Sequence, residues 1–440
     1  MRPVKQLKVV AVIGGGPAGA TAAEKLARGR TQSGPLVGWE IDVAPGSHQG
    51  VKDHSLLRPP GATLGIGHGT RVLLFEERPA WEKPCGGGLP YKALERYPFL
   101  LDASDPHVCV RDAELVAADG ESVRFRLPQP LAIYSRATLN RLLLRRAAEA
   151  GAEIVEDRIS DFRRSSAGWK LEGRRALYTA DYLILAAGAR TRLRGRLAAH
   201  FATRDFMLTF GYYIPRADNL LRVQFFRDFE GYAWSFPRPD HLSVGICGKA
   251  GENRMPELHE RLHGFMQRFG YDGASDLAGE QTTVFSHLLP ALSPESWHNL
   301  TLLGADWALA GDAAGLADPV TGEGIYFAMR SGELLAQSLL AATPETYPER
   351  VWQDFGRKLL LGSRLARPFY REDFLGRPST TRLVQFASRS QAFMKLLETL
   401  IAGTQSYSGL AFQLYKTLAK AAIETATDGL RNTPLAVTFR

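Results

Sequence analysis

The pattern of apolar positions near the start of the chain predicts a strand, a helix and a second strand. An unbroken apolar run over 8–13 is typical of a fully buried strand, the alanine-rich stretch 18–27 predicts a helix, and the run 71–76 predicts another buried strand. Between them, 30–69 is rich in glycine and proline and has no sustained period, which indicates either an inserted surface loop or an artefact of the gene model. We therefore expect a β-α-β unit, the building block of α/β sheets.

Farther along, the chain shows two other kinds of pattern. Short apolar runs at 181–188 and 307–311 predict further buried strands. The stretches 95–130 and 205–290 are rich in strands and predict an antiparallel sheet, whereas the chain from 344 onward has a helical pattern. The expected fold is an α/β Rossmann-like domain, an α+β domain built on an antiparallel sheet, and a C-terminal helical region.

The positive charge of the chain is concentrated at its C-terminal end. The formal net charge is +8, and the segment 357–440 alone carries thirteen basic and five acidic residues. Apolar side chains of this segment fall on two helical faces, made of Phe393, Leu396, Leu397, Leu400 and Ile401, and of Leu410, Leu414, Tyr415 and Leu418. Two interpretations stay open, namely peripheral contact with an anionic membrane through 357–440, or a helical cap packed on the antiparallel domain. We expect no nucleic-acid partner.

Composition excludes several classes of protein. A chain of 440 residues that is 45% hydrophobic and 23% charged is folded, with two or three domains, and is not disordered or fibrous. Cys85, Cys109 and Cys247 are too few for a disulfide framework, and no histidine or cysteine spacing indicates a metal site. Cys109 and Cys247 lie in apolar stretches, where we expect core positions. Reduced thiols and the lack of an apolar run long enough to span a membrane predict a cytoplasmic protein.

A glycine motif lies between the first strand and the first helix. Gly14-x-Gly16-x-x-Gly19 occupies the turn, in the order of elements that makes this motif informative for a dinucleotide site. The first glycine allows the turn, the second lets the backbone approach a pyrophosphate, and the third lets the helix pack on the strand. The unpaired N–H groups of the first helical turn, which begins at Ala18 directly after Pro17, would face the phosphates.

The second strand ends in acidic residues. Glu76 closes the run 71–76, with Glu77 as the alternative, and a carboxylate in this place typically binds the ribose hydroxyls of the nucleotide. Two later segments also end in small residues that permit backbone approach to a cofactor, one at Ala187 and Gly188 and the other after 307–311. Amides at the start of the following helix can stabilise negative charge on a reduced flavin. The residues expected to approach the cofactor in this later segment are Asp312, Gly322, Gly324 and Ile325.

With these motifs, the chain resembles the FAD-dependent geranylgeranyl reductase family, a branch of the para-hydroxybenzoate hydroxylase-type flavoproteins. The branch is indicated chiefly by Lys83-Pro84-Cys85-Gly86-Gly87 and by Tyr232-x-Trp234-x-Phe236-Pro237. The superfamily match is carried by the segments 14–27, 72–90, 134–154, 181–189, 231–248 and 310–332.

The resemblance implies FAD as cofactor, with contacts from Gly14, Gly16, Gly19, Glu76, Arg136 and Asp312. It also implies that Cys85 and Gly86 face the isoalloxazine ring and that Tyr232, Trp234 and Phe236 line a tunnel for a prenyl chain. The residues alone leave alternatives open: the aromatic side chains could be packed core, Arg136 could pair with a surface carboxylate, and Cys85 could be a small residue beside the ring instead of a reactive thiol. The domains that the resemblance implies are an FAD-binding domain of 1–94, 131–190 and 300–343 with the inserted loop 30–69, a substrate domain of 95–130 and 191–299, and a C-terminal helical region of 344–440.

The activity that the resemblance implies is reduction of C=C bonds in a prenyl chain, free or lipid-linked, by hydride transfer from flavin N5. The proton donor stays open between Glu323, Tyr232 and water, and the external reductant between NAD(P)H and a ferredoxin. The alternative is a flavin-dependent monooxygenase of the same fold, either a hydroxylase or a halogenase. Cys85-Gly86-Gly87-Gly88 stands where halogenases carry a GES-type signature, which argues against a halogenase.

Overall fold

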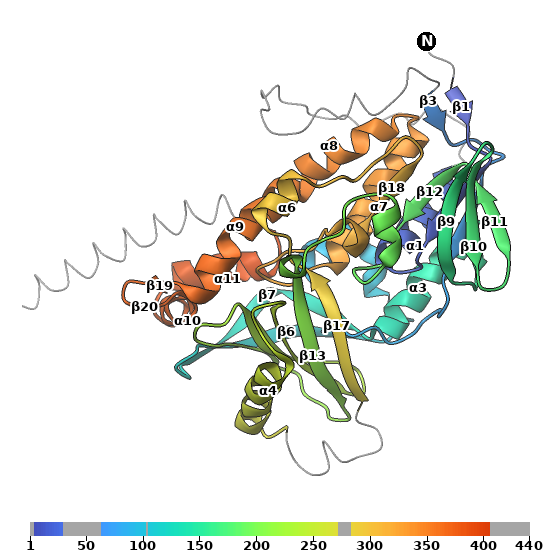
Figure 1. Cartoon of the computed structure of the whole chain (residues 1–440). Helices are drawn as coiled ribbons and strands as arrows, with labels where there is room; N and C mark the ends of the chain where they lie inside the picture. Colours follow the sequence, from blue (N-terminus) through green and yellow to red (C-terminus); the bar gives the residue numbers. More distant parts are fainter. Residues whose placement is uncertain (1–3, 30–62, 103, 272–282, 405–440) are drawn as a thin grey trace, which may run out of the picture.

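The structure is a computed structural model that describes residues 4–29, 63–102, 104–271 and 283–404 (Figure 1). A five-stranded parallel sheet has the order β18-β12-β2-β4-β8. Because all five strands are parallel, their carboxyl ends meet at one edge of the sheet. The strands are β2 (Val9–Ile13), β4 (Arg71–Phe75), β8 (Glu153–Val155), β12 (Tyr182–Leu185) and β18 (Trp307–Leu309).

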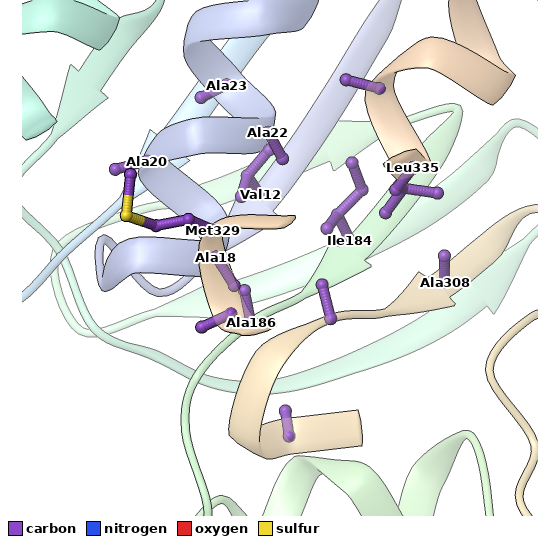
Figure 2. Packing of buried hydrophobic residues seen from close by; sticks show 14 of the residues in the cluster. Val12, Ala18, Ala20, Ala22, Ala23, Ile184, Ala186, Ala308, Met329 and Leu335 are labelled. Carbon is purple, nitrogen blue, oxygen red and sulfur yellow. The ribbon is translucent and has the colours of Figure 1, made fainter. Parts of the chain in front are cut away.

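Three helices pack on this sheet, namely α1 (Pro17–Gly29), α3 (Arg136–Glu149) and α7 (Ile325–Leu340). Small side chains let α1 and α7 approach closely, and Figure 2 shows Ala18 and Ala22 of α1 clustered with Met329 and Leu335 of α7. The apolar runs of the sequence are the buried strands of this layer, and the predicted β-α-β unit is present.

Part of the predicted inserted loop is a strand, which corrects the expectation for 30–69. Residues Thr63–Gly65 form β3 and pair in parallel with β1 (Val4–Gln6). Leu64 and Ile66 pack against the core, but two apolar side chains in a glycine-rich stretch gave no sustained periodic signal. The rest of that stretch, 30–62, lies outside the described residues.

An eight-stranded sheet forms the second layer, in the order β17-β13-β16-β15-β14-β6-β7-β5. All neighbours are antiparallel except β14 and β6, which are parallel. Helix α4 (Met255–Phe269) packs on this sheet. The strands are β5 (Gly88–Leu89), β6 (His107–Val116), β7 (Ser122–Tyr134), β13 (Phe206–Ile214), β14 (Leu221–Phe225), β15 (Gly231–Pro237), β16 (Leu242–Lys249) and β17 (Thr283–Pro290).

Smaller elements complete the two layers. A three-stranded antiparallel sheet is formed by β9 (Ile159–Ser165), β10 (Gly168–Gly173) and β11 (Leu177–Ala180). The short helices are α2 (Tyr91–Arg96), η2 (Pro98–Leu101), η3 (Arg192–Arg196), η4 (Thr203–Asp205), α6 (Pro294–His298), η5 (Gly311–Ala314) and η6 (Pro344–Thr346).

The described part of the C-terminal region, 344–404, is helical apart from one hairpin. The helices α8 (Tyr347–Val351), α9 (Arg357–Arg371), α10 (Ser379–Arg389) and α11 (Gln391–Ile401) follow one another, with a π-helical turn at Trp352–Gly356 and a hairpin of β19 (Asp373–Phe374) and β20 (Arg377–Pro378). None of the helices in the described ranges combines the length and apolar character needed to cross a bilayer.

The first of the two apolar helical faces points into the protein. Phe393 and Leu397 of α11 are buried in one cluster with Leu115 of β6 and Val123 of β7. Of the two interpretations given above, this packing corresponds to the helical cap on the antiparallel domain. The second face, 410–418, lies outside the described residues.

Candidate active site

One large cavity, of about 1050 Å³, joins the carboxyl edge of the parallel sheet to the eight-stranded sheet and the C-terminal helices. All but one of the residues expected from the sequence line it. They are Gly14, Gly16, Pro17, Ala18, Glu76, Glu77, Cys85, Gly86, Arg136, Ala187, Gly188, Tyr232, Trp234, Phe236, Asp312, Gly322, Glu323, Gly324 and Ile325. Gly19 is the exception, because it faces the strand: a Cβ there would lie 1.9 Å from the carbonyl oxygen of Gly14.

The glycine turn leaves the start of α1 open to the cavity. Gly14 has φ of 106°, and a Cβ on it would lie 2.5 Å from the carbonyl oxygen of Ala186. A Cβ on Gly16, by contrast, would meet no atom within 4 Å, so a ligand can approach the backbone there. An open helix N-terminus of this kind fits a pyrophosphate.

Glu76 and Glu77 differ in what they contact. The Glu76 carboxylate accepts hydrogen bonds from the amides of Gly15 (2.8 Å) and Arg78 (3.0 Å), so it lies beside the glycine turn. Glu77 instead forms ion pairs with Arg158 and Arg174. The structure therefore places the Glu76 carboxylate against the glycine turn, whereas the Glu77 carboxylate is paired with two arginines.

Arg136 is buried at the start of α3. The Ser135 hydroxyl accepts a hydrogen bond from the Thr138 amide (3.1 Å), so Ser135 is the N-cap of this helix. Arg136 is only 3% exposed, and its Nε has no hydrogen-bond partner among the described residues. A buried guanidinium N–H at the cavity wall fits an anionic ligand such as a phosphate.

The segment after β18 brings two carboxylates to the cavity. Asp312 lies 3.0 Å from the Lys83 ammonium. Burial raises the pKa of Asp312, but Lys83, with smaller contributions from His287 and Arg136, holds the pKa below its ordinary value. Glu323 accepts a hydrogen bond from the Tyr326 amide (2.8 Å) at the start of α7. Burial raises the pKa of Glu323, against the attraction of Lys92.

The glycines that follow Cys85 determine the backbone conformation of the loop that contains them. The Cys85 thiol accepts a hydrogen bond from the Gly87 amide (3.3 Å). Gly87 has φ of 84°, and a Cβ there would lie 2.0 Å from the carbonyl oxygen of Tyr134. A Cβ on Gly86 would lie 2.8 Å from the Phe236 ring, so the loop packs directly under the aromatic wall.

Tyr232, Trp234 and Phe236 share one face of β15, as alternate residues of a strand do. Trp234 is buried in a core cluster and also lines the cavity, so packed core and cavity wall coincide here. Beyond them the wall continues with apolar side chains from both the sheet and the C-terminal helices. These are Leu115, Leu131, Leu221, Val223, Phe225, Leu289, Phe369, Leu383, Leu397, Leu400 and Ile401.

One cysteine expectation was wrong. Cys247 is buried, and burial raises the pKa of its thiol to about 12. Cys109, however, is exposed. It stands between Val108 and Val110 on β6, and alternation along the strand turns it to the opposite side from the buried Val110.

Sequence reasoning gave no role in the site to Lys83, which it named only within the family motif, and it missed Lys92, His287 and Lys358, which also line the cavity. His287 on β17 lies in register with Thr209, which in turn aligns with Cys247. Its Nε2 is buried without a hydrogen-bond partner in the described part of the chain, and burial, with help from Lys83, lowers its pKa to about 3. Lys83 was within reach of sequence analysis, because it begins the glycine-rich segment; the others depend on strand and helix pairing.

A protein-family model described as FAD dependent oxidoreductase matches residues 104–338. The chain belongs to this family. FAD is its cofactor, and the open glycine turn and the buried Arg136 are groups that fit it. The fold and cofactor expected from the sequence are thus confirmed.

Relatives of this FAD-dependent oxidoreductase bear out the resemblance to geranylgeranyl reductases. The chain is 24% identical to the chloroplastic geranylgeranyl diphosphate reductase of Oryza sativa, over 82% of this chain and 73% of the relative. It is also 24% identical to the geranylgeranyl diphosphate reductase of Synechocystis, over 83% and 86% respectively.

Solved structures share the fold. A geranylgeranyl bacteriochlorophyll reductase-like protein of Thermoplasma acidophilum superposes with a TM-score of 0.69 at 20% identity, covering 94% of this chain and 99% of that one. The flavin-dependent brominase Bmp2 gives 0.64 at 14% identity, covering 94% and 100%. At such identities the oxidoreductase shares their architecture, and the choice of reaction rests on its own site.

Proposed function

We propose that this oxidoreductase reduces C=C bonds of a prenyl chain, of the geranylgeranyl type, that lies in the apolar part of the cavity. The observation that carries the proposal is the continuity of the cavity, whose wall includes both the expected FAD loops and a set of aliphatic and aromatic side chains. A long apolar chain buries its surface well against such a wall. In this proposal FAD lies along Gly14, Gly16, Glu76, Arg136 and Asp312.

The aromatic wall would control the medium of the reaction. Bound reduced FAD supplies a hydride from N5. An isolated alkene accepts a hydride poorly, so a proton has to reach one carbon as the hydride reaches the other. Trp234 and Phe236 would keep water out while this happens, and their rings would stabilise positive charge that develops on the chain.

We propose Glu323 as the proton donor. Tyr232 already donates its hydroxyl proton to the carbonyl of Thr321 (2.6 Å), and burial raises its pKa well above the ordinary value. Glu323 lies on the cavity wall with a pKa raised by burial, which favours the protonated form. Lys92 lies nearby, and burial together with Lys358 lowers its pKa to about 8, which suits a group that returns a proton to the carboxylate at neutral pH.

The proposal includes the partners expected from the sequence. A free or lipid-linked prenyl compound would be the substrate, and NAD(P)H or a ferredoxin would reduce the cofactor. Although α11 packs on the sheet as a cap, peripheral contact with an anionic membrane is proposed for other surfaces of 357–440, where Phe374 and Leu375 are exposed at the hairpin tip between Arg371 and Arg377. Flotation with anionic vesicles at low and moderate salt tests this contact, and no preference over neutral vesicles would end it.

The division of the chain follows the same proposal. The FAD-binding domain would comprise 1–94, 131–190 and 300–343, the substrate domain 95–130 and 191–299, and the helical region 344–440. The support is that the five-stranded sheet with α1, α3 and α7 falls in the first set and that nearly all of the eight-stranded sheet falls in the second.

The test is an anaerobic reaction with geranylgeranyl lipids. FAD-loaded protein is reduced by light, mixed with the lipid, and the products are analysed by mass spectrometry; we expect one H₂ gained for each double bond reduced as the flavin is oxidised. Val223→Trp would fill part of the apolar wall on β14, outside the expected FAD loops, so it should abolish the product while the cofactor still binds and is photoreduced. Val284→Trp, at an exposed valine of β17, is the matched control. Re-oxidation by air alone, with hydroxylated or halogenated products, would favour the monooxygenase alternative and overturn the proposal.

A further inference from the structure

Lys83 bridges the two layers of the molecule. Its backbone carbonyl accepts a hydrogen bond from the Tyr213 hydroxyl of β13 (3.2 Å), and the carbonyl of Cys85, two residues later, accepts one from Arg238. These bonds fix the loop to the eight-stranded sheet. The Lys83 ammonium meanwhile reaches Asp312 in η5, at the carboxyl edge of the parallel sheet, at 3.0 Å.

This ion pair lies among the loops proposed to hold FAD. A Cβ on Gly324 would lie 3.5 Å from Oδ1 of Asp312, and a Cβ on Gly188 would lie 4.0 Å from Nζ of Lys83. Gly324 is the N-cap of α7, and both glycines line the cavity. The side chains of Lys83 and Asp312 are only 19% and 14% exposed, so water screens them weakly.

The other titratable groups that influence Asp312 are His287 and Arg136. His287 is neutral at ordinary pH, because burial and the neighbouring Lys83 lower its pKa to about 3. Arg136 is a fixed positive charge at the start of α3, and it acts on Asp312 more weakly than Lys83 does. The charge closest to the Asp312 carboxylate is therefore that of Lys83.

We propose that Lys83 sets the reduction potential of the bound FAD by neutralising Asp312. This inference rests on the FAD placement of the proposed function and is independent of the prenyl substrate. Two-electron reduction adds negative charge to the flavin, and nearby positive charge or helix N-terminal amides stabilise it. An unpaired Asp312 carboxylate would oppose that charge, whereas an unpaired Lys83 ammonium would attract it.

The proposal predicts shifts of opposite sign in two variants. The potential of bound FAD is measured at saturating FAD, by slow enzymatic reduction beside a reference dye. In Lys83→Met the ratio of reduced to oxidised flavin at a fixed potential should fall about tenfold, a shift of about 30 mV to more negative values for a two-electron couple. Asp312→Asn should shift the potential in the positive direction, and the double variant should return toward the wild-type value. Lys83→Arg, which keeps the charge, is the matched control and should change little.

Two results would overturn the proposal. One is an unchanged potential in folded, FAD-loaded Lys83→Met, or shifts of the same sign in both single variants. The other is a loss of FAD binding, measured by fluorescence titration, in Lys83→Met but not in Lys83→Arg. That result would show that Lys83 anchors FAD and does not tune its potential. The potential measurement contains no prenyl compound, so its result does not depend on the proposed reductase reaction. Failure of that reaction would be seen only in the assay with geranylgeranyl lipids.

Discussion

Gly332 of α7 lies directly against Ala18 of α1: a Cβ on Gly332 would lie 2.2 Å from the Ala18 carbonyl oxygen. Both helices begin at the cavity, α1 beside the glycine turn and α7 beside Gly324. The contact therefore fixes the separation of the two helix N-termini that are proposed to face the phosphates and the flavin ring.

Gly332→Ala should for this reason force the two helices apart. We expect a loss of about 1–3 kcal/mol in the free energy of unfolding, the usual cost of overpacking, together with weaker FAD binding. Urea unfolding with and without FAD measures both. Gly264→Ala is the control, because a Cβ on Gly264 of α4 meets no atom within 4 Å; it should be neutral or stabilise the protein by up to about 1 kcal/mol. Equal effects in the two variants would contradict the argument.

Glu333, the next residue of α7, predicts how stability depends on pH. Its carboxylate accepts hydrogen bonds from Arg96 (2.7 Å) and Tyr97 (2.8 Å), and Arg330 adds an ion pair (2.9 Å). Burial alone would raise the pKa of Glu333, but these partners lower it to about 2. Because the folded pKa lies below the unfolded value of about 4.3, the stabilisation is complete above that pH and is lost as the pH falls toward 2.

The expected contribution of Glu333 at neutral pH is about 3 kcal/mol, from the difference between the two pKa values. Unfolding free energies of the wild type and of Glu333→Gln at pH 7, 5 and 3 test it, since their difference should shrink as the pH falls. Glu149→Gln, at an exposed glutamate of α3, serves as the control and should change little at any pH. A difference that stays constant with pH would show that Glu333 contributes through packing and not through its charge.

The neighbouring carboxylates Glu76 and Glu77 are expected to differ in their effect on FAD. Glu76 contacts the glycine turn, whereas Glu77 is paired with arginines. Glu76→Gln should weaken FAD binding about 10- to 100-fold, the value of one or two hydrogen bonds to a charged group. Glu77→Gln should change it by less than that. Titration of FAD fluorescence gives both dissociation constants, and the reverse order would make Glu77 the ribose ligand.

Sequence patterns predicted those site residues whose position is set by the helix or strand that contains them or lies next to them in the chain. The glycine turn, Glu76 at the end of a strand, and the alternating residues Tyr232 and Trp234 each follow from an element and the residues beside it. The parallel sheet was equally accessible, because strands buried on both faces have unbroken apolar runs. The family resemblance added FAD, which no single motif identified.

Long-range pairing decided what the sequence could not predict. His287 reaches the cavity because β17 pairs with β13, far away in the chain. Lys358 of α9 also lines it, with its ammonium 5.8 Å from the centre of the Phe327 ring of α7. The parallel pairing of β14 with β6 has no local signal either. Cys109 was misplaced for a different reason, since its apolar neighbours concealed the alternation of the strand.

Glu323 provides the sharpest test of the proposed chemistry. Glu323→Gln keeps an oxygen that can accept the Tyr326 amide hydrogen bond, so α7 should stay capped, but it removes the carboxyl proton. If Glu323 donates the proton, the rate of prenyl reduction should fall about 10²- to 10⁴-fold, while photoreduction of bound FAD is unchanged. Tyr232→Phe is the paired variant, because it removes the competing hydroxyl and keeps the ring. A larger loss in Tyr232→Phe than in Glu323→Gln would transfer the role to the tyrosine, and full activity in both would leave water as the source of the proton.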